Sequence, residues 1–366
     1  MNLEALATRP RFCAWRVISA VAIVVSLVAA SSSAQTPSSA SDAANSQFFA
    51  QFAATGLERV NVWRALAKIP PIVNDPTFSA AAFNHARYLV KNGIADGDMI
   101  LKDHRITVKI PPDASHWEKK GKPYFSEEGA AAAVYAAVLS ATKVDMTGPE
   151  FVDQLMTLPF SGVFPMVPQL TRVGIGGYCE PGQCAMVFTI RYQLEKTMRI
   201  ALYDGPPSDQ LWNERLGPVP GEAARLRIPV VFPPDGATVA LGAYNGGDMP
   251  DALSSCADYR SPTGIPISIQ FGQGSGPDGN VEISEHSLSH DGAELDTCPI
   301  TSATYRGPDQ KQTDIGKQGL WNGGVAIILP RRPLEPGRYK VSVTENSVRH
   351  EWSFTVAPTS KAPAAK

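Results

Sequence analysis

The sequence predicts an α+β protein with two domains, the first an α/β/α sandwich and the second an all-β sandwich. Residues 48–194 begin with helical periodicity and end in two strand-like runs, whereas residues 226–357 alternate polar and apolar side chains in short segments. Between them, residues 195–225 include GPPSDQLWNERLGPVPGE, whose Pro and Gly content is typical of a linker. A mature chain of about 330 residues also favours two domains over one.

The first 34 residues have the features of a secretory signal peptide. Arg9, Arg11 and Arg16 precede an apolar run over residues 17–30, and small residues at 32–34 supply a cleavage site. The run is shorter than the about 20 residues that a membrane span needs, although an uncleaved anchor is the alternative. We therefore expect a secreted or periplasmic protein that does not span the membrane. Residues 35–47 are expected to be a disordered linker, and residues 358–366 a disordered tail.

The charge balance excludes one class of partner. The chain has 33 Lys and Arg against 35 Asp and Glu, a net charge of −2, and its basic residues form no block. Because a nucleic-acid-binding surface needs a basic patch, we expect no nucleic-acid partner.

Capping residues and apolar periodicity indicate where the helices of the first domain begin. Residues 57–93 predict two packed helices joined by a Pro-rich turn, the second of them with Asp75 as N-cap and Pro76 in its first turn. A further helix is expected to start after Ser126 and to continue through AAAAVYAAVLS, and another to start near Pro149. The run RVGIGGYCEPGQCAMVFTIRY then predicts a β-hairpin that completes the sandwich.

Four cysteines remain if Cys13 leaves with the signal peptide, and an even number in an exported chain indicates disulfides. Cys179 and Cys184 flank the hairpin turn EPGQ, so we expect them to pair. Cys256 and Cys298 are then left to pair with each other.

The second domain is predicted from its period-two alternation. GRYKVSVTENSVRHEWSFTV indicates two strands joined by a turn at Asn346, and Asp291-Gly292 indicates another turn. The side chains expected to share one face are Tyr339, Val341, Val343, Trp352, Phe354 and Val356. The segment PLEPGRY resembles the corner of immunoglobulin-like modules in which a Tyr hydroxyl bonds the backbone. An immunoglobulin-like β-sandwich is therefore expected.

Three segments of the first domain carry a family resemblance. NVWRALAKIPPIVND with AAFNHARYLVKNG, then YFSEEGAAAA, and then QLMTLPFSGVFPMVPQLTRVGIGG together span roughly residues 57–192. They resemble the CAP superfamily of cysteine-rich secretory, antigen 5 and pathogenesis-related proteins, and more narrowly its bacterial exported branch. Members of this family commonly gather two His and two acidic residues in a cleft, which in some of them bind a divalent metal.

The resemblance implies a set of cleft residues in this chain. The first His corresponds to His104, and the Glu-bearing segment to Glu128, with Glu127 as the alternative register. The second acidic position corresponds to Asp153 or to Glu150. These side chains are candidates for ligand binding, and none is nominated as a catalytic residue.

The remaining His position of the family departs from the pattern, because Ser161 follows LPF there. One His with two carboxylates is a weaker zinc site than two His with carboxylates, so no cofactor is expected and a divalent metal is the alternative. Among the other histidines, His85 lies on an apolar helix face and is expected in the core. His116 is expected in a surface loop or at the cleft rim. His286 and His290 are expected on a solvated strand face, with metal binding at the strand edge as the alternative.

These observations predict a non-enzymatic exported binding protein. Its CAP-like cleft would hold a small apolar ligand or a cell-envelope component, with the β-sandwich as a spacer or docking module. The alternative is a metal-assisted hydrolase or peptidase in which Glu128 acts as general base on water bound to a cation near His104. A third possibility is a purely structural role at the cell surface.

Overall fold

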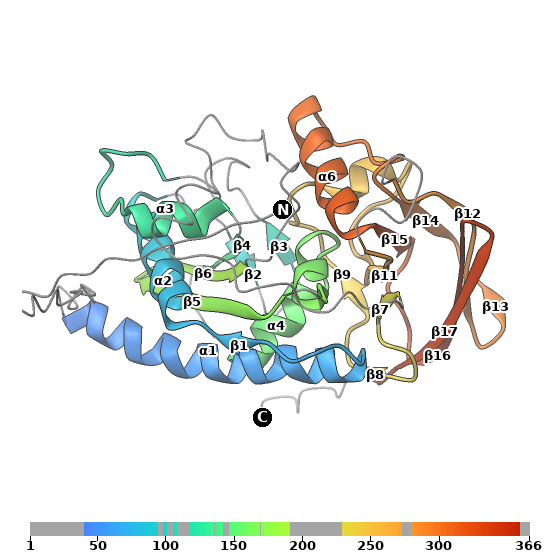
Figure 1. Ribbon diagram of the computed structural model, residues 1–366, viewed down its shortest axis with the longest axis horizontal. Coiled ribbons are helices and arrows are strands. Elements are labelled where there is room, and N and C mark those ends of the chain that lie inside the picture. Colours follow the sequence, from blue (N-terminus) through green and yellow to red (C-terminus); the bar gives the residue numbers. More distant parts are fainter. Residues whose placement is uncertain are drawn as a thin grey trace, which may run out of the picture. The chain divides into compact units, whose positions relative to one another are not determined.

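Figure 1 shows the computed structural model, which describes residues 40–93, 98–100, 105–107, 118–134, 136–141, 146–168, 170–190, 229–272 and 280–358. The predicted signal peptide, the linker at 195–225, nearly all of the predicted tail, His104 and His116 lie outside the described residues. By their contacts, the described residues belong to one compact unit. Residues 40–190 are called the first half below, and residues 229–358 the second half.

A four-stranded sheet forms the centre of the first half, with strand order β1-β5-β6-β4. Its strands are β1 (Val73–Asn74), β4 (Ala136–Ala141), β5 (Arg172–Glu180) and β6 (Gln183–Ile190). β5 and β6 form the predicted hairpin, and β1 pairs in parallel with β5. A separate pair joins β2 (Asp98–Ile100) to β3 (Arg105–Thr107).

Helices cover both faces of this sheet. They are α1 (Ala40–Leu66), α2 (Pro76–Lys91), α3 (Glu127–Val134), α4 (Gly148–Met156) and the 3-10 helix η1 (Ser161–Met166). On β5, Gly174 and Gly176 lie directly against the α2 backbone, whereas Gly177 lies against the ring of Phe49 in α1. Because side chains alternate along a strand, α1 and α2 must lie on opposite faces. α4 packs on α1, and α3 packs on α2.

The second predicted helix is confirmed with its cap. The Asp75 carboxylate accepts hydrogen bonds from the backbone N–H groups of Thr77 and Phe78, and Gly93 follows the helix with a φ of 64°. The helix near Pro149 is also confirmed, as α4.

The start of the first half differs from the prediction, because residues 40–47 are the first turns of α1 rather than a disordered linker. Contacts with β5 explain why this segment is helical. Asp42 is buried and accepts a 3.0 Å hydrogen bond from the Tyr178 hydroxyl, and Asn45 accepts a 2.8 Å bond from the N–H of Cys179. Ordering this segment is favourable because its polar side chains satisfy partners in the sheet.

The Ala-rich run after Ser126 was expected to be one helix and instead divides into two elements. α3 ends at Val134, and the residues that follow form β4, which pairs antiparallel with β6. The backbone of β4 finds its hydrogen-bond partners in the sheet, and this tertiary pairing overrides the high helix propensity of alanine.

Two sheets form most of the second half. One has the order β14-β15-β11-β7 and the other β13-β12-β16-β17-β8. The first comprises β7 (Val230–Phe232), β11 (Ile267–Gln270), β14 (Thr297–Ile300) and β15 (Val325–Pro330). The second comprises β8 (Thr238–Val239), β12 (Ile283–His290), β13 (Ala293–Glu294), β16 (Gly337–Glu345) and β17 (Val348–Val356). The smaller elements are β9 (Ala243–Tyr244), β10 (Thr263–Gly264) and the 3-10 helix η2 (Ala252–Ser255).

The predicted alternation in β16 and β17 is confirmed, because all six side chains expected to share one face are buried. The predicted corner is present as well: the Tyr339 hydroxyl donates a 2.8 Å hydrogen bond to the carbonyl of Glu335. One helix, α6 (Gln310–Gly323), was not predicted in this half. Its polar sequence carries a weak apolar stripe, although Asp309 caps it by accepting from the N–H of Gln312 at 2.7 Å.

Both predicted disulfides are present. Cys179–Cys184 closes the β5–β6 hairpin and is called the hairpin bridge below, and Cys256–Cys298 joins the residue after η2 to β14. Of the helices within the described ranges, none is both long enough and apolar enough to cross a membrane.

Candidate binding site at the start of helix α3

The Glu pair predicted from the sequence lies in the first turn of α3. The Ser126 hydroxyl accepts a 2.9 Å hydrogen bond from the N–H of Gly129, which confirms the predicted cap. Glu127 and Glu128 are half-buried and follow this cap directly. Negative side chains in a first turn are favourable against the helix dipole, so both the fold and a ligand-binding role account for these residues.

A buried His–Glu pair fixes the segment that enters α3. Nδ1 of His85 lies 3.0 Å from Oε1 of Glu118, and both side chains are fully buried. The second carboxylate oxygen of Glu118 accepts a 3.0 Å bond from the N–H of Ser126. His85 is therefore a core residue, as expected. Glu118 was not identified from the sequence, because it stands beside exposed lysines in a polar stretch and its partner is 33 residues away.

Tyr124 is a second residue that the sequence did not single out. It is 43% exposed, and its φ of 60° is unusual for a bulky side chain. Arg87 and Lys91 of α2 lie against its ring, at 5.4 Å and 5.3 Å from the centroid. Tyr124 thus presents an aromatic surface two residues before the cap of α3. Tyr124 stands in a turn in which the N–H of Phe125 donates a 3.3 Å hydrogen bond to the carbonyl of Lys122. The sequence has no Gly or Asn at this position of positive φ to indicate the turn.

The two candidates for the second acidic position serve the local fold instead. The Asp153 carboxylate accepts hydrogen bonds from Nε of Arg59 at 2.7 Å and from the indole N–H of Trp63 at 2.9 Å. Glu150 accepts a 2.7 Å bond from the N–H of Thr147, completing a capping box. Both lie on α4, which packs on the sheet face opposite to α3. The described structure therefore does not bring Asp153 next to Glu127 and Glu128.

Ser161, which the sequence resemblance aligns with the family's last His, binds a carboxylate of the second half. Its hydroxyl donates a 2.7 Å hydrogen bond to Asp248, and the same carboxylate accepts from the N–H groups of Phe160 at 2.5 Å and of Ser161 at 3.2 Å. Burial raises the pKa of Asp248, and the hydrogen bonds from Ser161 and Phe160 oppose that shift. The N–H of Asp248 in turn donates to the Tyr244 hydroxyl at 3.3 Å.

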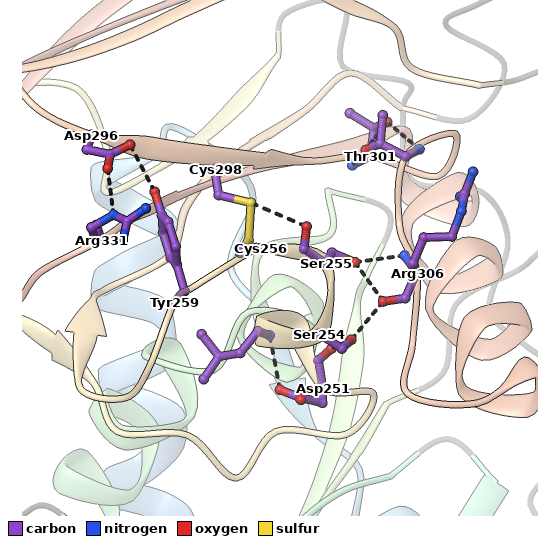
Figure 2. Close-up of a disulfide and its surroundings, with 12 residues drawn as sticks. Asp251, Ser254, Ser255, Cys256, Tyr259, Asp296, Cys298, Thr301, Arg306 and Arg331 are labelled. Atoms are coloured by element: carbon purple, nitrogen blue, oxygen red, sulfur yellow. Dashed lines mark hydrogen bonds and ion pairs between the residues drawn. A yellow bond between two sulfur atoms is a disulfide. The ribbon is translucent and has the colours of Figure 1, made fainter.

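The loop that carries Asp248 continues into a rigid segment around the Cys256–Cys298 disulfide (Figure 2). Figure 2 shows the Ser254 and Ser255 hydroxyls both donating to the carbonyl of Arg306, at 2.7 Å and 2.9 Å. The Asp251 side chain caps the N–H of Leu253 at 3.0 Å. These bonds and the disulfide fix the loop on its own half.

The two histidines of β12 differ from the prediction in their exposure. His286 and His290 are half-buried on β12 rather than fully solvated, and the His290 ring stacks on Tyr339 at 4.5 Å. Within the described ranges, no group of three or more His, Cys, Asp or Glu side chains is arranged to hold a metal ion. His104 lies outside those ranges, so its place in the predicted cleft stays a prediction.

Comparisons with known proteins add little. No family model matches the chain, and no curated protein matches it. Among solved structures, one that is similar is PcoC, a methionine-rich copper resistance protein from Escherichia coli. The match covers 34% of this chain and 92% of PcoC, with 15% sequence identity and a TM-score of 0.20. Its selenomethionine form is similar over 94% of its length, with 15% identity and a TM-score of 0.19. A likeness at these scores carries no argument about the fold or the ligand of this chain.

Proposed function

We propose that this protein is an exported, CAP-like binding protein with an immunoglobulin-like second half. It binds a small apolar ligand or a cell-envelope component at the start of α3, where Glu127, Glu128 and the exposed ring of Tyr124 lie close together along the chain. An aromatic surface beside polar groups is the usual composition of a small-molecule site. The two disulfides are compatible with an oxidising compartment.

One observation favours a binding protein over an enzyme. Two of the positions that would complete a four-residue polar site are committed to the fold, since Asp153 binds Arg59 and Trp63, and Ser161 binds Asp248. A catalytic carboxylate or hydroxyl needs to reach a substrate, whereas these two groups are already bonded to other side chains of the protein, Asp153 at a partly exposed site and Ser161 at a buried carboxylate. The surface near α3 retains recognition groups without this second set.

A thermal-shift screen of the mature protein against lipids, sterols and cell-wall fragments tests the proposal. A ligand present at about 100 times its Kd stabilises the folded state by about 2.7 kcal/mol, which gives a clear rise in Tm. Tyr124→Ala and Glu128→Gln should reduce the rise. Glu58→Gln, an exposed Glu of α1 on the other sheet face, is the matched control and should leave it unchanged.

Two outcomes contradict binding at α3. One is the absence of stabilisation by every class of probe at millimolar concentration. The other is turnover of a probe that is lost in His104→Ala, which would favour the metal-assisted hydrolase instead.

A further inference from the structure

A groove of about 420 Å³ lies on the outer face of the sheet β13-β12-β16-β17-β8, away from the candidate site at α3. Its floor contains Arg338 and Lys340 of β16. The strand register pairs Lys340 with Ser289 of β12 on one side and with Ser353 of β17 on the other. Paired residues and residues two apart share a sheet face, so these four side chains all project outward, opposite to the buried Tyr339.

Hydrogen bonds hold both ends of the groove in place. At one end, the N–H of Asp291 donates to the carbonyl of Arg338 at 3.1 Å. At the other, the N–H of Ser353 donates to the Asp235 carboxylate at 3.0 Å, and the N–H of Gly236 donates to the carbonyl of Ser353 at 2.7 Å. The groove is therefore preformed, which lowers the entropy cost of binding a ligand.

Two of the three carboxylates that line the groove are already engaged. Asp235 accepts the backbone bond just described, and Glu351 forms ion pairs with Arg349 at 2.8 Å and with Lys340 at 3.5 Å. Asp291 is different, because its side chain is 69% exposed and lies 3.4 Å from Nε2 of His290, an atom that makes no hydrogen bond within the described residues. Asp235 and Glu351 have partners within the protein, so the groove does not offer a cluster of free carboxylates to a cation.

Several hydrogen-bond donors that line the groove, in contrast, have no partner in the described residues. Arg338 is exposed, and in the described part of the chain its guanidinium has no hydrogen-bond or ion-pair partner, nor do the hydroxyls of Ser289 and Ser353. Lys340 is 63% exposed and shares only the longer of the two ion pairs of Glu351. The groove thus has one guanidinium and two hydroxyls without a partner in the described part of the chain, and an oxygen anion bound at Arg338 would supply their acceptors.

We propose that this groove binds a small ligand through a carboxylate or phosphate group, with Arg338 as its anchor. A guanidinium matches the planar fork of a carboxylate and two oxygens of a phosphate, and the flanking hydroxyls add donors on either side. The volume is at the small end of the range for ligand sites, which suits a ligand about the size of a single sugar. This site is independent of the one proposed at α3.

Isothermal titration with three sugars of similar size tests the proposal. Glucuronate carries a carboxylate, glucose 6-phosphate carries a phosphate, and glucose carries neither. At least one of the anionic sugars should bind at least about tenfold more tightly than glucose, and which of them binds identifies the group. Arg338→Gln should weaken that binding by about tenfold or more, as expected for the loss of a charge-assisted hydrogen bond.

Arg332→Gln is the matched control, because Arg332 is an exposed arginine of the same half that does not line the groove. It should bind like the wild type. Both substitutions replace exposed side chains, and near-ultraviolet circular dichroism checks that each variant is folded. Equal binding of glucose and the anionic sugars, equal binding by Arg338→Gln and wild type, or no binding of either anionic sugar at millimolar concentration would each overturn the proposal.

Discussion

Replacing Asp248 with Ala should cost more stability than any substitution in the predicted cleft. The carboxylate is buried and receives hydrogen bonds from the Ser161 hydroxyl and from the backbone N–H groups of Phe160 and Ser161. The substitution leaves three donors of the first half without an acceptor.

The magnitude follows from those three donors. A buried donor without a partner costs about 1–3 kcal/mol, and costs that arise at one site are not additive. We therefore expect Asp248→Ala to lower the free energy of unfolding by about 3–5 kcal/mol. Ser161→Ala removes only the hydroxyl donor, so it should cost about 2 kcal/mol.

Urea denaturation of the disulfide-bonded protein, followed by tryptophan fluorescence, measures these differences. Asp314→Ala on α6 replaces an exposed Asp and should change stability by no more than about 0.5 kcal/mol. If Asp248→Ala changes stability by less than about 1 kcal/mol, the carboxylate does not hold the η1 segment and the reasoning fails.

The stability that Asp248 contributes should depend on pH. Burial raises the pKa of Asp248 above its ordinary value of 3.8, so the folded state holds the proton more tightly than the unfolded state. The stability linked to this group is fully present below pH 3.8 and is lost as the pH rises through the folded pKa. The stability of the wild type minus that of Asp248→Asn should therefore decrease as the pH is raised from 3 to 7.

Three further predictions concern the described contacts. Replacing Cys256 and Cys298 by Ala should lower the free energy of unfolding by about 4 kcal/mol, and removing the hairpin bridge should lower it by about 2 kcal/mol, because the disulfides close loops with sequence separations of 42 and 5. Urea unfolding curves measure both losses, and a larger loss for the hairpin bridge would contradict the loop-entropy argument. Asp153→Ala should lower the free energy of unfolding by about 2 kcal/mol without changing the affinity of any ligand found at α3. If isothermal titration shows that this variant has lost affinity, Asp153 is part of the binding site. Gly129→Ala places a Cβ 2.4 Å from the Glu118 carboxylate and should cost about 1–3 kcal/mol, and thermal unfolding like that of the wild type would count against the buried pair.

The parts of the fold that sequence analysis predicted depend on short-range signals. The Asp75 cap, the turn of the β5–β6 hairpin, the hairpin bridge and the Tyr339 corner each join residues no more than 5 positions apart. Such features are determined by local backbone geometry and by side chains that reach only their neighbours. The Cys256–Cys298 disulfide is the exception, because its separation is 42 and it was predicted as the pair that was left over.

What the sequence could not predict depends on distant partners. Asp153 binds Arg59 across 94 residues, and Ser161 binds Asp248 across 87. Asp153 was a cleft candidate because nothing nearby in the sequence reveals its partner, and nothing near Ser161 indicates that it binds Asp248. For the same reason β4 was expected to be helical, since its partner strand β6 lies later in the chain. The candidate site thus retained Glu127 and Glu128, whereas Glu118 and Tyr124 emerged only from the structure.

Hydrogen–deuterium exchange with the ligand that raises Tm most tests the central claim directly, because it reports where that ligand protects the backbone. Binding at the start of α3 predicts slower exchange across residues 118–134 in the wild type, with the protection reduced in Tyr124→Ala. Protection confined to residues 283–356, or none at residues 118–134, would contradict binding at this site.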